Sequence, residues 1–189
     1  MFTSRSRWAP AALAVWLAGC SLFPPVKADS SVKPEKERKP APEFALKDAD
    51  GRTVRLSEYK GKIVLLNFWA TWCGPCKFEM PWFIEFERTY KDRGFAVVGI
   101  SMDEEGWPAI KPFVADMGVN YRILLGGDDT AALYGGVEAL PTTFVIDRQG
   151  RVAATHVGLA GKDDFENDIK QLLSGGSAGL AGVRHAGAR

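Results

Sequence analysis

Apolar residues are concentrated between positions 42 and 173, in short runs that alternate between a strand pattern and a helix pattern. Residues 63–70 and 95–102 are almost continuously apolar and rich in branched side chains, which is typical of strands covered on both faces. Between them, residues 74–92 have the length of a helix, and Gly94 stands where a helix C-terminus is expected. This order predicts a strand–helix–strand unit at the centre of one domain.

The remaining elements extend this unit on both sides. Residues 44–56 predict a hairpin with its turn at Asp50 and Gly51. The later pattern predicts a helix over 107–117, a strand over 121–125, a short helix over 130–134, strands over 142–147 and 151–157, and a helix over 163–173. Asp128 or Asp129 is the expected cap of the short helix. The alternation of strands and helices indicates an α/β sheet with helices on both faces.

The first 19 residues have the organisation of an export signal. Arg5 and Arg7 precede an apolar stretch over residues 8–18, which is too short to span a bilayer. The stretch ends in Leu-Ala-Gly before Cys20, and this order resembles a bacterial lipoprotein signal, in which the cysteine is lipidated and becomes the mature N-terminus. An ordinary secretory signal with an incidental Cys20 is the alternative. The resemblance implies an exported protein, lipid-anchored to a bacterial membrane, with its domain facing the periplasm or the cell exterior.

Two further segments flank the predicted domain, which is expected over residues 42–173. Residues 20–41 contain several prolines and mixed charges without apolar periodicity, and we expect them to form a tether to the membrane. Residues 174–189 are rich in glycine, alanine and serine, and we expect a disordered tail there. The chain's hydrophobic fraction of 46% and its net charge of +1 fit a globular protein and exclude an electrostatic surface for nucleic acid.

The three cysteines, Cys20, Cys73 and Cys76, define the candidate chemistry. A closed zinc site needs four ligands, and with Cys20 assigned to the lipid the chain offers few besides His156 and His185, so we expect no metal. A purely structural disulfide between Cys73 and Cys76 would close a very short loop and contribute little stability. Their placement after a buried strand and at a helix N-terminus, where the helix dipole favours a thiolate on Cys73, indicates thiol–disulfide exchange instead.

The motif Trp-Cys-Gly-Pro-Cys over residues 72–76, followed later by Leu-Pro-Thr-Thr over 140–143, resembles the thioredoxin fold. The resemblance implies that Pro141 forms a cis peptide bond and faces the cysteine pair. It also implies that the backbone of Leu140 pairs with an extended substrate segment. No cofactor is expected beyond the redox-active cysteine pair itself. The substrate-binding residues implied in this way are Trp72, Gly74, Pro75 and Leu140.

Glu79, three residues after Cys76, points to a narrower group. The pattern Cys-x-x-Cys-x-x-Glu, the N-terminal hairpin and a central insertion over residues 103–136 resemble the membrane-tethered thioredoxin-like proteins of the TlpA and ResA kind, some of which serve cytochrome c maturation. Thioredoxins carry a buried aspartate where this chain has Asn67, which cannot transfer protons. Glu79 is therefore the candidate acid–base group beside the cysteines, and a solvated surface carboxylate is its alternative.

Together these residues predict an extracytoplasmic thiol–disulfide oxidoreductase that reduces disulfides in target proteins, with Glu79 and Pro141 as catalytic residues besides the cysteines. Its expected partners are a disulfide-bearing protein substrate and a membrane-embedded electron donor, because one dithiol stores one electron pair. A thiol peroxidase related to peroxiredoxins is an alternative, although that family's proline ahead of the cysteine is missing. A non-catalytic metal or haem-protein chaperone is another, although a wider cysteine spacing and a distal histidine are typical of it. The sequence leaves open the direction of electron flow, the target, the choice of membrane and the oligomeric state.

Overall fold

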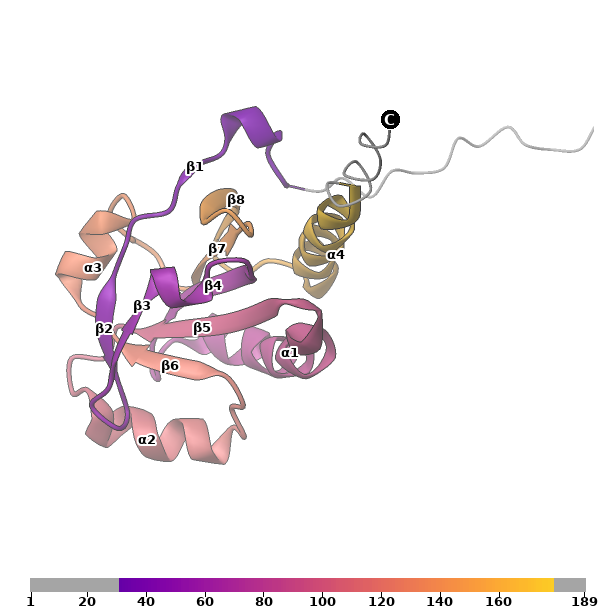
Figure 1. The fold of residues 1–189 in the computed structure, drawn as a ribbon. Coiled ribbons are helices and arrows are strands. Elements are labelled where there is room, and N and C mark those ends of the chain that lie inside the picture. The colour runs from indigo at the N-terminus through magenta and orange to yellow at the C-terminus, as the bar shows by residue number, and fades with distance from the viewer. Residues whose placement is uncertain (1–30, 179–189) are drawn as a thin grey trace, which may run out of the picture.

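The computed structural model describes residues 31–178 and shows an eight-stranded sheet with helices on both faces (Figure 1). The strands lie in the order β1-β8-β7-β4-β5-β6-β2-β3 across the sheet. Their bounds are β1 (Lys39–Pro40), β2 (Ala45–Asp48), β3 (Thr53–Arg55), β4 (Ile63–Trp69), β5 (Phe95–Ser101), β6 (Arg122–Leu125), β7 (Thr142–Ile146) and β8 (Arg151–Val157). The α-helices are α1 (Gly74–Tyr90), α2 (Trp107–Asp116), α3 (Asp128–Leu133) and α4 (Lys162–Ala178).

The centre of the sheet is formed by β4 and β5, whose residues are all buried. These two strands are parallel, β6 runs parallel to β5, and β7 runs antiparallel to β4. The apolar runs of the sequence occupy these strands because both of their faces are covered. The carboxyl ends of β4, β5 and β6 lie at one edge of the sheet, and the loop after β5 contacts the loop that leads from β4 to the cysteines.

Helices α1, α2 and α4 pack on one face of the sheet, and α3 packs on the other (Figure 1). Leu65 of β4 lies in an apolar cluster with Phe83 of α1 and Phe165 of α4, whose rings meet edge to face at 5.2 Å between centroids. Side chains alternate along a strand, so the neighbouring Leu66 points to the opposite face, where it packs in a second cluster with Tyr134. The sheet therefore has two apolar cores, one on each side.

Most predicted elements are confirmed, including the β2–β3 hairpin and the left-handed Gly94 after the first helix, with φ of 78°. The short helix α3 differs from the prediction because it begins at Asp128. Its N-cap residue is Gly127, and no side chain caps the helix, so the predicted capping role of Asp128 or Asp129 is wrong. Both acids lie in the first helical turn instead, where they face the positive end of the helix dipole.

The folded region begins earlier than the sequence predicted. Lys39 and Pro40, assigned to the tether, form β1 and pair with β8. Further upstream, the Lys33 backbone N–H donates to the Ala153 carbonyl over 2.8 Å. The prediction of a tether over residues 20–41 is therefore wrong from Ser31 onward. This pairing could not be predicted from hydrophobic patterns, because backbone pairing along a sheet edge requires no apolar periodicity.

The folded region also ends later than predicted, since α4 continues to Ala178 and makes residues 174–178 helical. The predicted signal peptide, Cys20 and the rest of the predicted tail lie outside the described residues. Within residues 31–178, no helix is both long enough and apolar enough to cross a membrane.

Candidate functional site

Cys73 and Cys76 lie where β4 passes into α1, and they form a disulfide. Cys73 is the N-cap residue of α1, and its Sγ accepts a hydrogen bond from the Cys76 backbone N–H over 3.2 Å. This N–H is one of the donors that a helix leaves free at its N-terminus, so it favours negative charge on Cys73 once the pair is reduced. Both residues are buried, with 4% and 2% of their surface exposed, so accessibility hardly distinguishes the two thiols.

An open surface adjoins the buried disulfide. Trp72, directly before Cys73, has 66% of its surface exposed. Gly74 and Pro75 form the exposed first turn of α1, and a Cβ added at Gly74 would meet nothing within 4 Å. Proline is tolerated in this turn because the first N–H groups of a helix have no intrahelical acceptor. The three predicted substrate-binding residues of the motif are thus accessible to a partner.

The loop before β7 lies against the same site. The Leu140–Pro141 peptide bond is cis, which confirms that part of the prediction. Leu140 packs against the apolar cluster that contains both cysteines, and the buried Pro141 accepts a hydrogen bond from the Gly158 backbone N–H over 2.8 Å. Pairing of the Leu140 backbone with a substrate stays a prediction.

Glu79 lies on the buried face of α1, one turn after Cys76, with 1% of its surface exposed. The alternative of a solvated surface carboxylate is therefore wrong. Its Oε1 accepts a hydrogen bond from the Ala160 backbone N–H over 3.2 Å, and within the described residues its Oε2 has no hydrogen-bond partner. Burial raises the pKa of Glu79 from 4.5 to about 7, against the opposing effects of the Ala160 N–H and of His156. Protonated and ionised forms therefore coexist near neutral pH.

Asn67 and Trp69 are buried residues of β4, the strand that leads to the cysteines. Asn67 is buried, and its Nδ2 donates to Thr143 Oγ1 over 2.9 Å. Trp69 is fully buried and packs against Phe113 of α2 with 5.5 Å between ring centroids. Neither side chain can exchange protons with the cysteines. On the buried face of α1, the titratable residue nearest to the cysteines in sequence is Glu79.

His156 and Asp168 are two polar residues of the site region that the sequence analysis did not assign. His156 Nε2 lies 2.9 Å from Asp168 Oδ2, and the same oxygen accepts a hydrogen bond from Ser31 Oγ over 2.6 Å. Positive charge on His156 lowers the pKa of Glu79. Asp168 sits on the apolar side of α4, next to Phe165 and Ile169 in the helical repeat. A charged residue at an inward helical position was the signal that could have revealed this pair.

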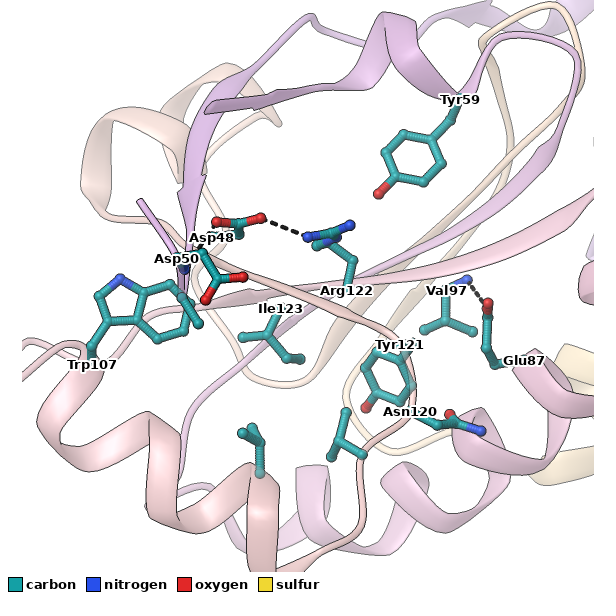
Figure 2. Close-up of a pocket in the computed structure, with 13 residues that line it drawn as sticks. Asp48, Asp50, Tyr59, Glu87, Val97, Trp107, Asn120, Tyr121, Arg122 and Ile123 are labelled. Carbon is teal, nitrogen blue, oxygen red and sulfur yellow. Dashed lines mark hydrogen bonds and ion pairs between the residues drawn. The ribbon is translucent and has the colours of Figure 1, made fainter. Parts of the chain in front are cut away.

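A separate groove of about 500 Å³ lies between α2, β6 and the β2–β3 hairpin (Figure 2). Figure 2 shows the Arg122 side chain extending toward Asp48, to which its Nη1 donates over 2.6 Å. On another wall, the Glu87 carboxylate accepts a hydrogen bond from the Val97 backbone N–H over 2.7 Å. These charged groups already have partners, and none of the predicted site residues lines the groove. Within residues 31–178, no cluster of three or more His, Cys, Asp or Glu residues is suited to a metal ion.

Known proteins resemble this chain in sequence and in fold. Residues 38–155 match the family model described as the AhpC/TSA family. The thiol-disulfide oxidoreductase ResA of Bacillus thuringiensis (strain Al Hakam) is 37% identical over 135 residues, which make up 71% of this chain and 77% of that protein.

Two solved structures are similar along nearly their whole length. The thiol:disulfide interchange protein of the thioredoxin family from Chlorobium tepidum TLS is 34% identical with a TM-score of 0.66, covering 72% of this chain and 97% of that chain. The pneumococcal exposed lipoprotein thioredoxin from Streptococcus pneumoniae strain TIGR4 is 30% identical with a TM-score of 0.60, covering 69% of this chain and 99% of that chain. The thioredoxin-like fold predicted from the sequence is thereby confirmed.

Proposed function

Because the chain belongs to the AhpC/TSA family and is a thiol–disulfide oxidoreductase of the ResA kind, we propose that it reduces disulfides in protein substrates outside the cytoplasm. The observation on which this proposal depends most is the Cys73–Cys76 disulfide at the N-terminus of α1, one helical turn from the buried carboxyl group of Glu79. A dithiol at this position can transfer one electron pair and needs no further cofactor.

In the proposed reaction, the Cys73 thiolate attacks one sulfur of the substrate disulfide. A mixed disulfide forms, and the other substrate sulfur leaves as a thiolate that takes up a proton. The Cys76 thiol then loses its proton and attacks the Cys73 sulfur, which releases the second substrate thiol and forms the Cys73–Cys76 disulfide. The hydrogen bond from the Cys76 N–H to Cys73 Sγ supports Cys73 as the attacking residue.

Glu79 acts in this scheme as the proton carrier of the buried site. With its pKa near 7, it can accept the proton of Cys76 and return a proton to a departing sulfur. Its unpaired Oε2 supports this role, because an oxygen without a fixed partner remains available to a thiol. The exposed Trp72, Gly74 and Pro75 would contact the substrate chain, together with Leu140 and Pro141 of the loop before β7.

We propose that the protein is anchored by a lipid at Cys20 and receives electrons from a membrane-embedded donor. The order of residues 5–20 supports the anchor, and a solved relative is described as an exposed lipoprotein. Similarity to ResA supports a role in cytochrome c maturation, in which the substrate would be a cysteine pair that has to be reduced before haem attachment.

The test uses the full chain, reduced and then freed of reductant, and a peptide with an oxidised Cys-x-x-Cys-His sequence, the haem-attachment pattern. We expect one peptide disulfide to be reduced for each Cys73–Cys76 pair oxidised, and no reaction with a Cys73→Ala variant. A wild-type protein that leaves the peptide oxidised but is rapidly oxidised by hydrogen peroxide would instead favour the thiol peroxidase.

A further inference from the structure

Asp103 is a buried carboxylate that has no part in the reaction scheme above. It lies just after β5, in the loop to α2, with 3% of its surface exposed. This loop runs beside the loop that joins β4 to α1, because β4 and β5 are parallel neighbours and end at the same edge of the sheet. A charged group buried at this edge is costly unless nearby donors satisfy it.

The donors come mainly from the loop that leads to the cysteines. The Thr71 backbone N–H lies 3.1 Å from Asp103 Oδ1 and 3.0 Å from Oδ2, and the Thr71 hydroxyl donates to Oδ1. Ser101 Oγ donates to Oδ2 over 2.6 Å and accepts from the Asp103 N–H over 3.2 Å. Both carboxylate oxygens are thus occupied, and the group links two loops that are 32 residues apart in sequence.

Further backbone bonds reinforce the same junction. The Met102 N–H donates to the Trp69 carbonyl over 2.8 Å, and the Cys73 N–H donates to the Ala70 carbonyl over 3.1 Å. Thr71 stands between these two bonds and is fixed by Asp103. These hydrogen bonds fix the backbone as far as Thr71. Trp72 and Cys73 follow directly after this residue in the chain.

Two other buried aspartates stabilise turns that lie away from the disulfide. Asp48 and Asp147, each with 3% of their surface exposed, accept backbone N–H groups from the turns that they themselves begin. Their bonds stabilise hairpins away from the disulfide. Asp48 and Asp147 each form an ion pair with an arginine as well, whereas the equally buried Asp103 accepts hydrogen bonds from Thr71, in the loop that leads to the cysteines.

We propose that Asp103 is a positioning residue for thiol–disulfide exchange: it holds Thr71 so that Trp72 and Cys73 meet the substrate disulfide in one geometry. Exchange requires the attacking sulfur to approach the target sulfur along the axis of the bond that breaks. Displacing a reacting group by about 1 Å costs on the order of a hundredfold in rate. Loss of the hydrogen bonds between Asp103 and Thr71 should therefore slow exchange more than it destabilises the fold.

The experiment compares matched variants of the full chain in the peptide reduction assay, with the melting temperature measured in parallel. Thr71→Val removes the hydroxyl donor at constant shape, whereas Thr71→Ser retains it. Asp103→Asn removes one acceptor oxygen, and Asp48→Asn makes this change at a hairpin, where it also removes the charge that pairs with Arg122. We expect kcat/KM to fall about tenfold or more in Thr71→Val and Asp103→Asn, and to stay within about twofold of wild type in Thr71→Ser and Asp48→Asn.

The wild-type rate tests the oxidoreductase reaction itself, so its failure is distinguishable from failure of this proposal. Equal rates per folded molecule in Asp103→Asn and Asp48→Asn would overturn the proposal. So would a rate loss in Asp103→Asn that follows a changed alkylation pKa of Cys73, because the carboxylate would then act through its charge. If Asp103→Asn does not fold, the comparison of Thr71→Val with Thr71→Ser still decides the question.

Discussion

The buried carboxyl group of Glu79 should make the stability of the oxidised protein depend on pH in a specific way. Its pKa is about 7 in the folded protein, compared with an ordinary value of 4.5. Between these values the folded state keeps the proton and the unfolded state releases it, so stability falls as pH rises. The loss begins near pH 4.5 and is complete above about pH 7. Because Glu79 is almost fully buried, solvent screening reduces the effect little.

The size of this loss follows from the two pKa values. Each pH unit between them costs about 1.4 kcal/mol, so the whole interval costs about 3 kcal/mol. Glu79→Gln keeps the shape and the acceptor for the Ala160 N–H but cannot ionise. Relative to wild type, we expect the variant to gain about 3 kcal/mol in unfolding free energy between pH 4.5 and pH 8.

The assay is urea unfolding of both disulfide-bonded proteins at half-unit steps across this range. The difference between the two curves isolates Glu79, because His156 and Asp168 are present in both proteins. Glu85→Gln, on the exposed side of the same helix, controls for removing a carboxylate from α1. Parallel curves for wild type and Glu79→Gln would refute the argument, since they would mean that the carboxyl group titrates alike in the folded and unfolded chains.

Three further outcomes are expected. Cys76→Ala should accumulate a mixed disulfide with substrate through Cys73, visible on non-reducing gels; trapping by the Cys73→Ala variant instead would reverse the assigned roles. A labelled fatty acid should be incorporated into the wild type and not into Cys20→Ala, and equal release of both into the soluble fraction would contradict the lipid anchor. Gly99→Ala would place a Cβ 2.8 Å from Ile123 Cδ1, so we expect a loss of about 1–3 kcal/mol in unfolding free energy, measured by urea unfolding; an unchanged midpoint would show that the core yields at no cost.

The sequence was sufficient for those parts of the fold whose signal is local. Strands β4 and β5 could be predicted from the apolar runs over residues 63–70 and 95–102, because a strand buried on both faces is apolar almost throughout. The cysteine motif likewise located the start of α1. Ser31 to Ala41 were misassigned because their attachment depends on backbone hydrogen bonds to β8 and on polar side-chain contacts such as Ser31 with Asp168, and neither requires an apolar pattern.

The site was predictable to the same extent. Glu79 could be identified because it belongs to the cysteine motif, although its raised pKa comes from burial in the folded core, and the groups that oppose the rise, Ala160 and His156, lie far along the chain. Asp103 carried no comparable signal. Its importance arises from Thr71, which only the parallel arrangement of two strands brings near.

The early start of the folded region changes how far the domain could travel from a membrane. With a lipid at Cys20 and attachment to the domain beginning at Ala41, the intervening chain could extend at most about 70 Å. Because Ser31 already bonds to Asp168, only half of that chain is left, and the limit becomes about 35 Å. Halving the greatest distance between the lipid anchor and the domain reduces the volume that the domain can sample about eightfold. Under the proposed anchoring, the domain would therefore work close to the lipid surface, where encounters with a membrane-embedded donor are frequent and distant substrates must diffuse to it.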